Sequence, residues 1–203
     1  HWSGVAAALS QDGADTCLEA LQMADRMGLT ISCDLNYRKN LWKYGRTAAD
    51  VMKPLVQYSD VIFGAEPEYK EILGIAPVGF KAEEVGKQVA KLVPRCRKMF
   101  LELRNSLSAN HNLLAAVLYS DGSLKHTGIY DITHEVDRVG TGDAFVGGLI
   151  YGLLTYPDDD QKALDFALAA SCLKNTFYGD FNLATVAEVE ALMNGDSSGR
   201  VQR

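Results

Sequence analysis

Four consecutive residues of this chain, Gly140-Thr141-Gly142-Asp143, are of types that could bind an anion and move a proton beside it. A mainly apolar stretch follows them and predicts a helix from Asp143 to Leu154. The backbone N–H groups of a glycine-rich turn at a helix N-terminus point toward one place and attract anions such as phosphate. The Asp143 carboxylate would stand beside that anion, where it could accept a proton from an attacking hydroxyl group.

A simpler interpretation of these residues stays open, in which Asp143 caps the helix and the glycines form a tight turn. Two well-known nucleotide loops are excluded. Phe145 stands where a dinucleotide-binding G-x-G-x-x-G pattern needs its third glycine, and the P-loop pattern G-x-x-x-x-G-K-[S/T] occurs nowhere in the chain. If the loop binds phosphate, it belongs to another kind of phosphotransferase.

The stretch from Asp137 to Gly148 resembles the C-terminal signature of the PfkB, or ribokinase-like, family of sugar kinases. The resemblance implies that ATP is the phosphoryl donor and that Asp143 is the general base for the sugar hydroxyl. It also implies an anion hole for the ATP phosphates at Gly140, Thr141 and Gly142. The commonest family form has alanine in place of Thr141 and a small residue in place of Arg138. Threonine should be tolerated, because backbone N–H groups bind the phosphates.

Three further segments resemble the 2-keto-3-deoxygluconate kinases within that family. They are Asp34–Trp42, Leu173–Thr176 and Gly179–Asn182, and the sequence Val-Asp-Arg-Val-Gly before the glycine loop is also typical. The resemblance implies Mg-ATP-dependent phosphorylation of 2-keto-3-deoxygluconate at its terminal hydroxyl, giving 2-keto-3-deoxy-6-phosphogluconate. Fructokinase or ribokinase activity is the alternative within the enzymes. A catalytically inert nucleotide-binding fragment is the alternative outside them.

The expected sugar side of the site is the run Asn36-Tyr37-Arg38, which follows a predicted strand over Leu29–Leu35. The guanidinium of Arg38 can donate two parallel hydrogen bonds to the carboxylate of a sugar acid. Asn36 and Tyr37 would add hydrogen bonds. The alternative is a surface loop whose charges are simply solvated.

The expected metal and nucleotide contacts come from the resemblance too. Glu68 takes the position of a glutamate that orders Mg²⁺ through water, although Ala65 replaces the family's asparagine. Glu68 could instead be an acidic residue of a helix's first turn. The other implied nucleotide contacts are Arg104 and Ser106 near the phosphates and Asn175 in the adenine pocket.

The order of predicted elements places these residues in an α/β fold. Predicted helices alternate with short apolar strands, which indicates a mostly parallel sheet covered on both faces. The segments Asp34–Arg38, Gly64–Glu68 and Arg104–Ser108 follow predicted strands and should converge at one edge. Asp121-Gly122 between two apolar runs predicts a hairpin. The resemblance implies a ribokinase-like three-layer αβα sandwich.

The chain starts at His1, where the resemblance places the middle of the kinase fold. We therefore expect a partial kinase domain over residues 1–195, without the N-terminal part and β lid, and a frayed polar tail over 196–203. Isolated, such a chain should be inactive and self-associating. The full-length protein could be a homo-oligomer.

Composition limits the partners of the chain. A net charge of −6 with mixed signs argues against a nucleic-acid partner, and no apolar run is long enough to span a membrane. The four cysteines lie far apart and form no zinc or disulfide pattern, so a reducing cytoplasm is the expected compartment. Cys33 and Cys172 stand in apolar runs and should be buried thiols.

Overall fold

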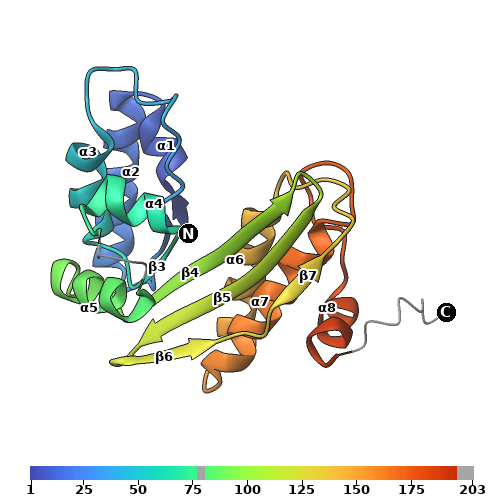
Figure 1. Ribbon diagram of the computed structural model, residues 1–203. Helices are drawn as coiled ribbons and strands as arrows, with labels where there is room; N and C mark the ends of the chain where they lie inside the picture. Colours follow the sequence, from blue (N-terminus) through green and yellow to red (C-terminus); the bar gives the residue numbers. More distant parts are fainter. Residues whose placement is uncertain (77–80, 196–203) are drawn as a thin grey trace. The chain divides into compact units, whose positions relative to one another are not determined.

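The computed structural model describes residues 1–76 and 81–195, and it divides into two compact units (Figure 1). Unit 1 comprises His1–Glu102 and Val117–Leu124, and unit 2 comprises Leu103–Ala116 and Lys125–Arg203. The predicted tail over 196–203 lies outside the described residues. Within the described ranges, no helix is long and apolar enough to cross a membrane.

Unit 1 is built on a parallel sheet, with strands in the order β1-β2-β3-β4. The strands are β1 (Trp2–Ser3), β2 (Ser32–Asp34), β3 (Val61–Gly64) and the first residues of β4 (Lys98–Ser108). The connecting helices are α1 (Gly4–Ala8), α2 (Gln11–Arg26), α3 (Ala48–Val56), α4 (Glu66–Glu68), the π-helix η1 (Tyr69–Leu73) and α5 (Ala82–Leu92). This alternation is the one that the sequence pattern predicts for an α/β protein.

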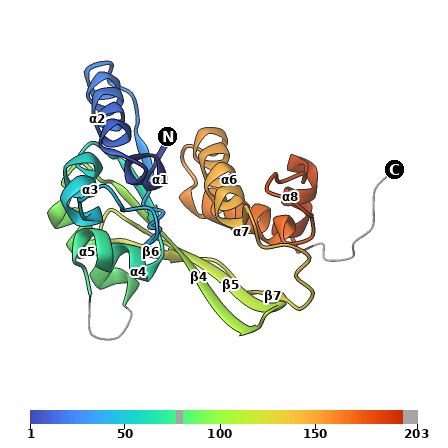
Figure 2. The same ribbon diagram turned by 90° about the horizontal axis from the view of Figure 1, so that it is seen from above.

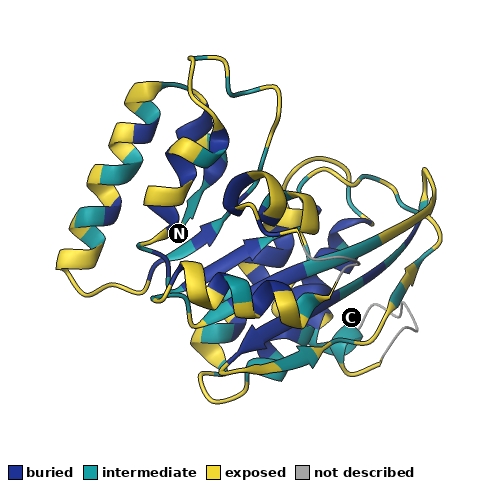
Figure 3. Ribbon diagram, turned by 60° about the vertical axis from the view of Figure 1, so that its left-hand side comes forward, coloured by how far each residue is buried: buried dark blue, intermediate teal, exposed yellow. Residues whose placement is uncertain are grey.

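The core of unit 1 forms where the strand residues are buried by the helices around them. Cys33, Ile62 and Phe100 are fully buried, and the Phe63 and Phe100 rings stack with centroids 5.5 Å apart. Figure 3 shows buried residues along the central strands. Strands that are buried on both faces consist mainly of apolar residues. The sequence pattern could therefore predict them.

Unit 2 contains the rest of β4, most of β5 (His111–Ser120), the end of β6 (Ser123–His126) and β7 (Tyr130–Ile132). Its helices are α6 (Thr141–Thr155), α7 (Asp160–Lys174) and α8 (Val186–Met193). β7 pairs antiparallel with β5. Helix α6 runs alongside α7 (Figures 1 and 2), and a Cβ added to Gly148 would lie 2.9 Å from the Ala170 Cβ. Small residues therefore let the two helices approach closely.

Most predicted elements are present within a few residues of their expected bounds. The hairpin turn has positive φ at both Asp121 (49°) and Gly122 (78°), as a tight two-residue turn requires. Helix α2 begins at Gln11 because the Ser10 hydroxyl accepts a hydrogen bond from the Gly13 N–H.

One prediction about strand ends is wrong. Residues 104–108 do not follow a strand but form the second half of β4, which continues to Ser108 because it lies beside β5 across a tight turn. The sequence pattern places the end of this strand too early because its outer residues are exposed and polar. Cys33 and Cys172 are buried, as expected, and all four cysteines are free thiols.

Candidate functional site

The glycine loop of unit 2 turns the chain into helix α6. Gly140 is the N-cap residue, with a left-handed φ of 78°, and a Cβ at this position would lie 2.0 Å from the Asp180 carbonyl oxygen. Only glycine meets both requirements. The first N–H groups of a helix have no partner within the helix; here the Thr141 N–H donates to the Arg138 carbonyl oxygen, which precedes the helix, at 3.3 Å. The start of α6 is therefore shaped to receive an anion.

Asp143 is not the cap of this helix. It is the third residue of α6, exposed in the first turn, and Gly140 occupies the cap position. The interpretation of Asp143 as an N-cap is wrong because helix α6 already begins at Thr141, so the cap position falls on Gly140. A carboxylate in the first helical turn benefits from the helix dipole and here remains accessible for chemistry.

A pocket of about 390 Å³ opens beside Asp143. Asp143 and Tyr151 of α6 line it together with Phe166 of α7 and Phe181 of the following loop. Its size lies in the range of small-molecule sites, and it combines aromatic walls with two carboxylates, those of Asp143 and Asp180.

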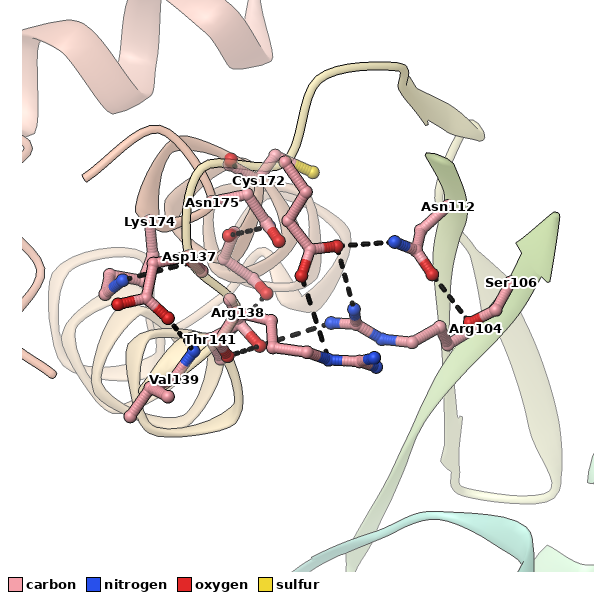
Figure 4. A network of polar contacts seen from close by, with 12 residues as sticks. Arg104, Ser106, Asn112, Asp137, Arg138, Val139, Thr141, Cys172, Lys174 and Asn175 are labelled. Atoms are coloured by element: carbon pink, nitrogen blue, oxygen red, sulfur yellow. Dashed lines mark hydrogen bonds and ion pairs between the residues drawn. The ribbon is translucent and has the colours of Figure 1, made fainter. Parts of the chain in front are cut away.

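Asp137 and Lys174 form hydrogen bonds that connect the glycine loop with the loop after α7 (Figure 4). The Asp137 carboxylate accepts hydrogen bonds from the N–H groups of Val139 (3.0 Å) and Gly179 (2.9 Å), which hold its pKa below the usual value. The fully buried Lys174 donates from Nζ to the carbonyl oxygens of Phe177 (3.0 Å) and Asp137 (3.4 Å). A buried ammonium is tolerated only when such acceptors replace its water. Lys174 and Asp137 therefore join the glycine loop to the loop after α7.

Thr141 links the glycine loop to β4. Its hydroxyl donates to the Arg138 carbonyl oxygen (3.0 Å) and accepts from Arg104 Nη2 (3.2 Å), and its own carbonyl accepts from the Ser171 hydroxyl (3.0 Å). The threonine thus makes side-chain contacts that an alanine could not. Arg104 therefore lies beside the glycine loop, and its contact with phosphate stays a prediction.

The other two expected nucleotide contacts have partners within the protein. Ser106 donates to Asn112 Oδ1 at 2.6 Å. Asn175 is fully buried, and its Nδ2 donates to the backbone carbonyl of Ser171 (2.9 Å). The backbone carbonyl of Asn175 accepts a hydrogen bond from the Val136 N–H (2.8 Å). Asn175 therefore joins α7 to the segment before the glycine loop, and its contact with adenine stays a prediction.

The expected sugar-binding residues lie at the carboxyl end of β2 in unit 1. Asn36 has a positive φ of 38°, and its N–H donates to the Asp34 carboxylate at 3.1 Å. This turn exposes the Arg38 side chain, whose Nη1 lies 3.4 Å from the Tyr37 carbonyl oxygen. Arg38 is therefore a surface cation at a strand end, the place where parallel sheets bind ligands.

Glu68 joins this turn to the end of β3. Its two carboxylate oxygens accept from the N–H groups of Tyr37 (3.1 Å) and Ala65 (2.8 Å), so the β2 and β3 ends meet as predicted. Burial raises the pKa of Glu68, although these two hydrogen bonds and the charge of Arg38 act in the opposite direction. Each oxygen keeps a second lone pair, so the carboxylate can also accept a hydrogen bond from a water molecule of hydrated Mg²⁺. In the described ranges, no group of three His, Cys, Asp or Glu side chains could hold a metal ion.

The raised pKa of Glu68 predicts a pH effect on stability. The folded protein holds this proton more tightly than the unfolded chain, whose glutamate titrates at about 4.3. Glu68 therefore contributes most to the free energy of unfolding below that pH, and the contribution is lost as the pH rises through the higher folded pKa. In denaturant titrations, the stability of the parent minus that of Glu68→Gln should fall over this window. A difference that rises with pH would contradict the assignment.

Gly140→Ala tests the glycine loop. A non-glycine residue in a left-handed conformation costs about 1–3 kcal/mol, and the contact with the Asp180 carbonyl adds to this cost. We expect a clear loss of unfolding free energy in chemical denaturation. Gly147→Ala in the same helix is the matched control, because no described atom lies within 4 Å of its added Cβ. Equal stability of Gly140→Ala and the parent protein would show that the loop geometry is wrong.

The fold and the loop together define a class of protein: an α/β chain with a glycine-capped helix, an anion site and an exposed carboxylate in the first helical turn. Residues 1–182 match the family model described as pfkB family carbohydrate kinase. The chain belongs to the pfkB family of carbohydrate kinases.

Known proteins similar to the chain include two named for 2-dehydro-3-deoxy sugar acids. The 2-dehydro-3-deoxygalactonokinase of Haloferax volcanii is 31% identical over 98% of this chain and 58% of its own length. The crystal structure of the 2-dehydro-3-deoxygluconokinase of Thermotoga maritima is 37% identical, with a TM-score of 0.89 over 96% of this chain and 59% of its own. The chain thus spans less than two thirds of each relative.

A second similar structure supports the fold alone. It is a fructokinase of Vibrio cholerae with bound fructose, ADP and a calcium ion, 24% identical, with a TM-score of 0.73 over 95% of this chain and 59% of its own.

Proposed function

We propose that this chain forms part of an ATP-dependent kinase that phosphorylates 2-keto-3-deoxygluconate to 2-keto-3-deoxy-6-phosphogluconate. The observation that carries the proposal is Asp143, an exposed carboxylate in the first turn of a helix that Gly140 caps in a left-handed conformation. Family membership supports kinase activity on a carbohydrate. The names of the Haloferax and Thermotoga relatives support a keto-deoxy sugar acid as the acceptor.

The residues of unit 2 would act on the transferred phosphoryl group. Asp143 accepts the proton of the attacking hydroxyl, while the N–H groups of the loop at Gly140–Gly142 bind the phosphate oxygens. The contacts of Thr141, Asp137 and Lys174 keep these N–H groups in place before the substrate arrives. Such preorganised donors stabilise the charge that develops during phosphoryl transfer.

Mg²⁺ bound with ATP would neutralise phosphate charge. Magnesium keeps several of its waters in proteins and needs few carboxylates, so Glu68 could contact it through water with the lone pairs that its backbone hydrogen bonds leave.

The residues of unit 1 would recognise the sugar acid. The exposed Arg38 offers the paired donors that a carboxylate accepts, and the turn at Asn36 and Tyr37 presents polar groups beside it. Galactonate-type and gluconate-type acids share the carboxylate and the keto group. Arg38 therefore selects the class of acid, and hydroxyl contacts select the member.

The experiment is an assay of the full-length protein with Mg-ATP and four acceptors: 2-keto-3-deoxygluconate, 2-keto-3-deoxygalactonate, fructose and ribose. We expect the highest kcat/KM with 2-keto-3-deoxygluconate and a product phosphorylated at its terminal hydroxyl. Preference for fructose or ribose would replace the proposal with the neutral-sugar alternative. Binding of ATP without turnover of any acceptor would support the inert nucleotide-binding alternative.

A further inference from the structure

A nearly buried carboxylate, Glu135, lies next to the phosphate loop between two arginines. Its side chain is only 4% exposed. One oxygen lies 3.8 Å from Arg104 Nη1 and accepts a hydrogen bond from Asn112 Nδ2, and the other lies 3.7 Å from Arg138 Nε. Glu135 stands outside the glycine motif in the sequence.

Both arginines also meet at the first residue of α6. Arg104 donates to the Thr141 hydroxyl, and the Arg138 carbonyl accepts from that same hydroxyl (Figure 4). Glu135 therefore contacts the guanidinium groups of the two residues that bind the Thr141 hydroxyl, Arg104 through its guanidinium and Arg138 through its backbone carbonyl.

The two arginines differ in exposure. The Arg104 side chain is 19% exposed, whereas that of Arg138 is 55% exposed. Glu135 faces the Nε of Arg138, and in the described part of the chain the two Nη groups of Arg138 have no hydrogen-bond partner. These Nη groups are the pair of donors with which arginine binds phosphate.

We propose that Glu135 is a positioning residue for phosphate binding: it orients Arg104 toward Thr141 and directs the exposed Nη groups of Arg138 to the phosphates of the nucleotide. The inference rests on the proposed function. Removal of the Glu135 charge removes the ion pair with Arg138 Nε, so the Arg138 guanidinium is no longer held in one orientation. A purely structural Glu135 would instead affect all ligands alike.

The test compares Glu135→Gln with the parent full-length protein by calorimetric binding of ATP and of adenosine, which lacks phosphates. We expect ATP binding to weaken by about threefold to tenfold, the net worth of one ordinary hydrogen bond, because Glu135 acts on the phosphates only through Arg138, and adenosine binding to stay unchanged. KM for ATP should rise by the same factor, while KM for the sugar acid stays the same. Parallel losses for ATP and adenosine, or no loss for either, would overturn the inference.

Two further variants keep the test decisive if Glu135→Gln folds poorly. Arg138→Gln, on the exposed side, should show the same selective loss for ATP, and the double variant should lose little more than either single one because both act through one contact. Additive losses would contradict the inference. Asp131→Asn is the matched control, since its exposed carboxylate faces His111 instead of the arginines, and it should bind ATP normally.

The outcomes also separate this inference from the proposed function. If the parent protein binds no ATP or phosphorylates no sugar acid, the proposed function fails. If the parent protein does both and Glu135→Gln and Arg138→Gln behave like it, only the role of Glu135 fails.

Discussion

Asp143→Asn should reduce kcat by about 10²–10⁴, the usual contribution of a general base, and leave ATP affinity close to that of the parent protein. Asparagine has nearly the same size and keeps the loop filled, but it cannot accept the proton of the attacking hydroxyl at neutral pH. The exposure of Asp143 in the first turn of α6 makes it available for this step. The residual rate would come from the N–H groups that bind phosphate.

The measurement is steady-state kinetics with 2-keto-3-deoxygluconate, together with calorimetric binding of ATP. Asp160→Asn is a suitable control because Asp160 is also an acidic residue in the first turn of a helix, α7. It changes the same charge and a similar interaction with a helix dipole, so its kcat should match the parent value. An Asp143→Asn protein that turns over at the parent rate would show that another group accepts the proton.

Arg38→Ala should raise KM for the keto-deoxy sugar acid by roughly 10- to 100-fold, the worth of a charge-assisted hydrogen-bonded pair, while KM for ATP stays the same. The side chain is exposed, its Nη1 makes a long hydrogen bond to the Tyr37 carbonyl oxygen, and its charge also acts on Glu68. Its removal should therefore cost the fold little.

Lys39→Ala is the control for this prediction, because it removes an adjacent exposed cation without the fork geometry of arginine. Neutral sugars such as fructose should respond weakly to either substitution. Equal losses for acid and neutral acceptors would mean that Arg38 does not bind the carboxylate, and the preference for a sugar acid would lose its basis in this chain.

Local sequence determined the elements that carry the site. Apolar runs between helical patterns predicted the parallel strands of unit 1, and Asp121-Gly122 predicted the hairpin, because short-range backbone preferences suffice for such features. The glycines before α6 indicated an anion loop for the same reason, since glycine allows the positive φ of Gly140. The prediction failed where a neighbouring strand outweighs local polarity, as in the second half of β4.

Tertiary structure alone decided which side chains support the loop. Glu135, Asp137 and Lys174 are ordinary charged residues in the sequence, and their roles come from partners up to 42 positions away, such as Gly179 for Asp137. Burial creates these roles, because a charge removed from water must find hydrogen bonds or opposite charges nearby. The sequence by itself determined the glycine loop and the position of Asp143 beside it, because these depend on local residue types, whereas folding decided how the loop is held and that Asp143 lies in the first turn of α6 instead of capping it.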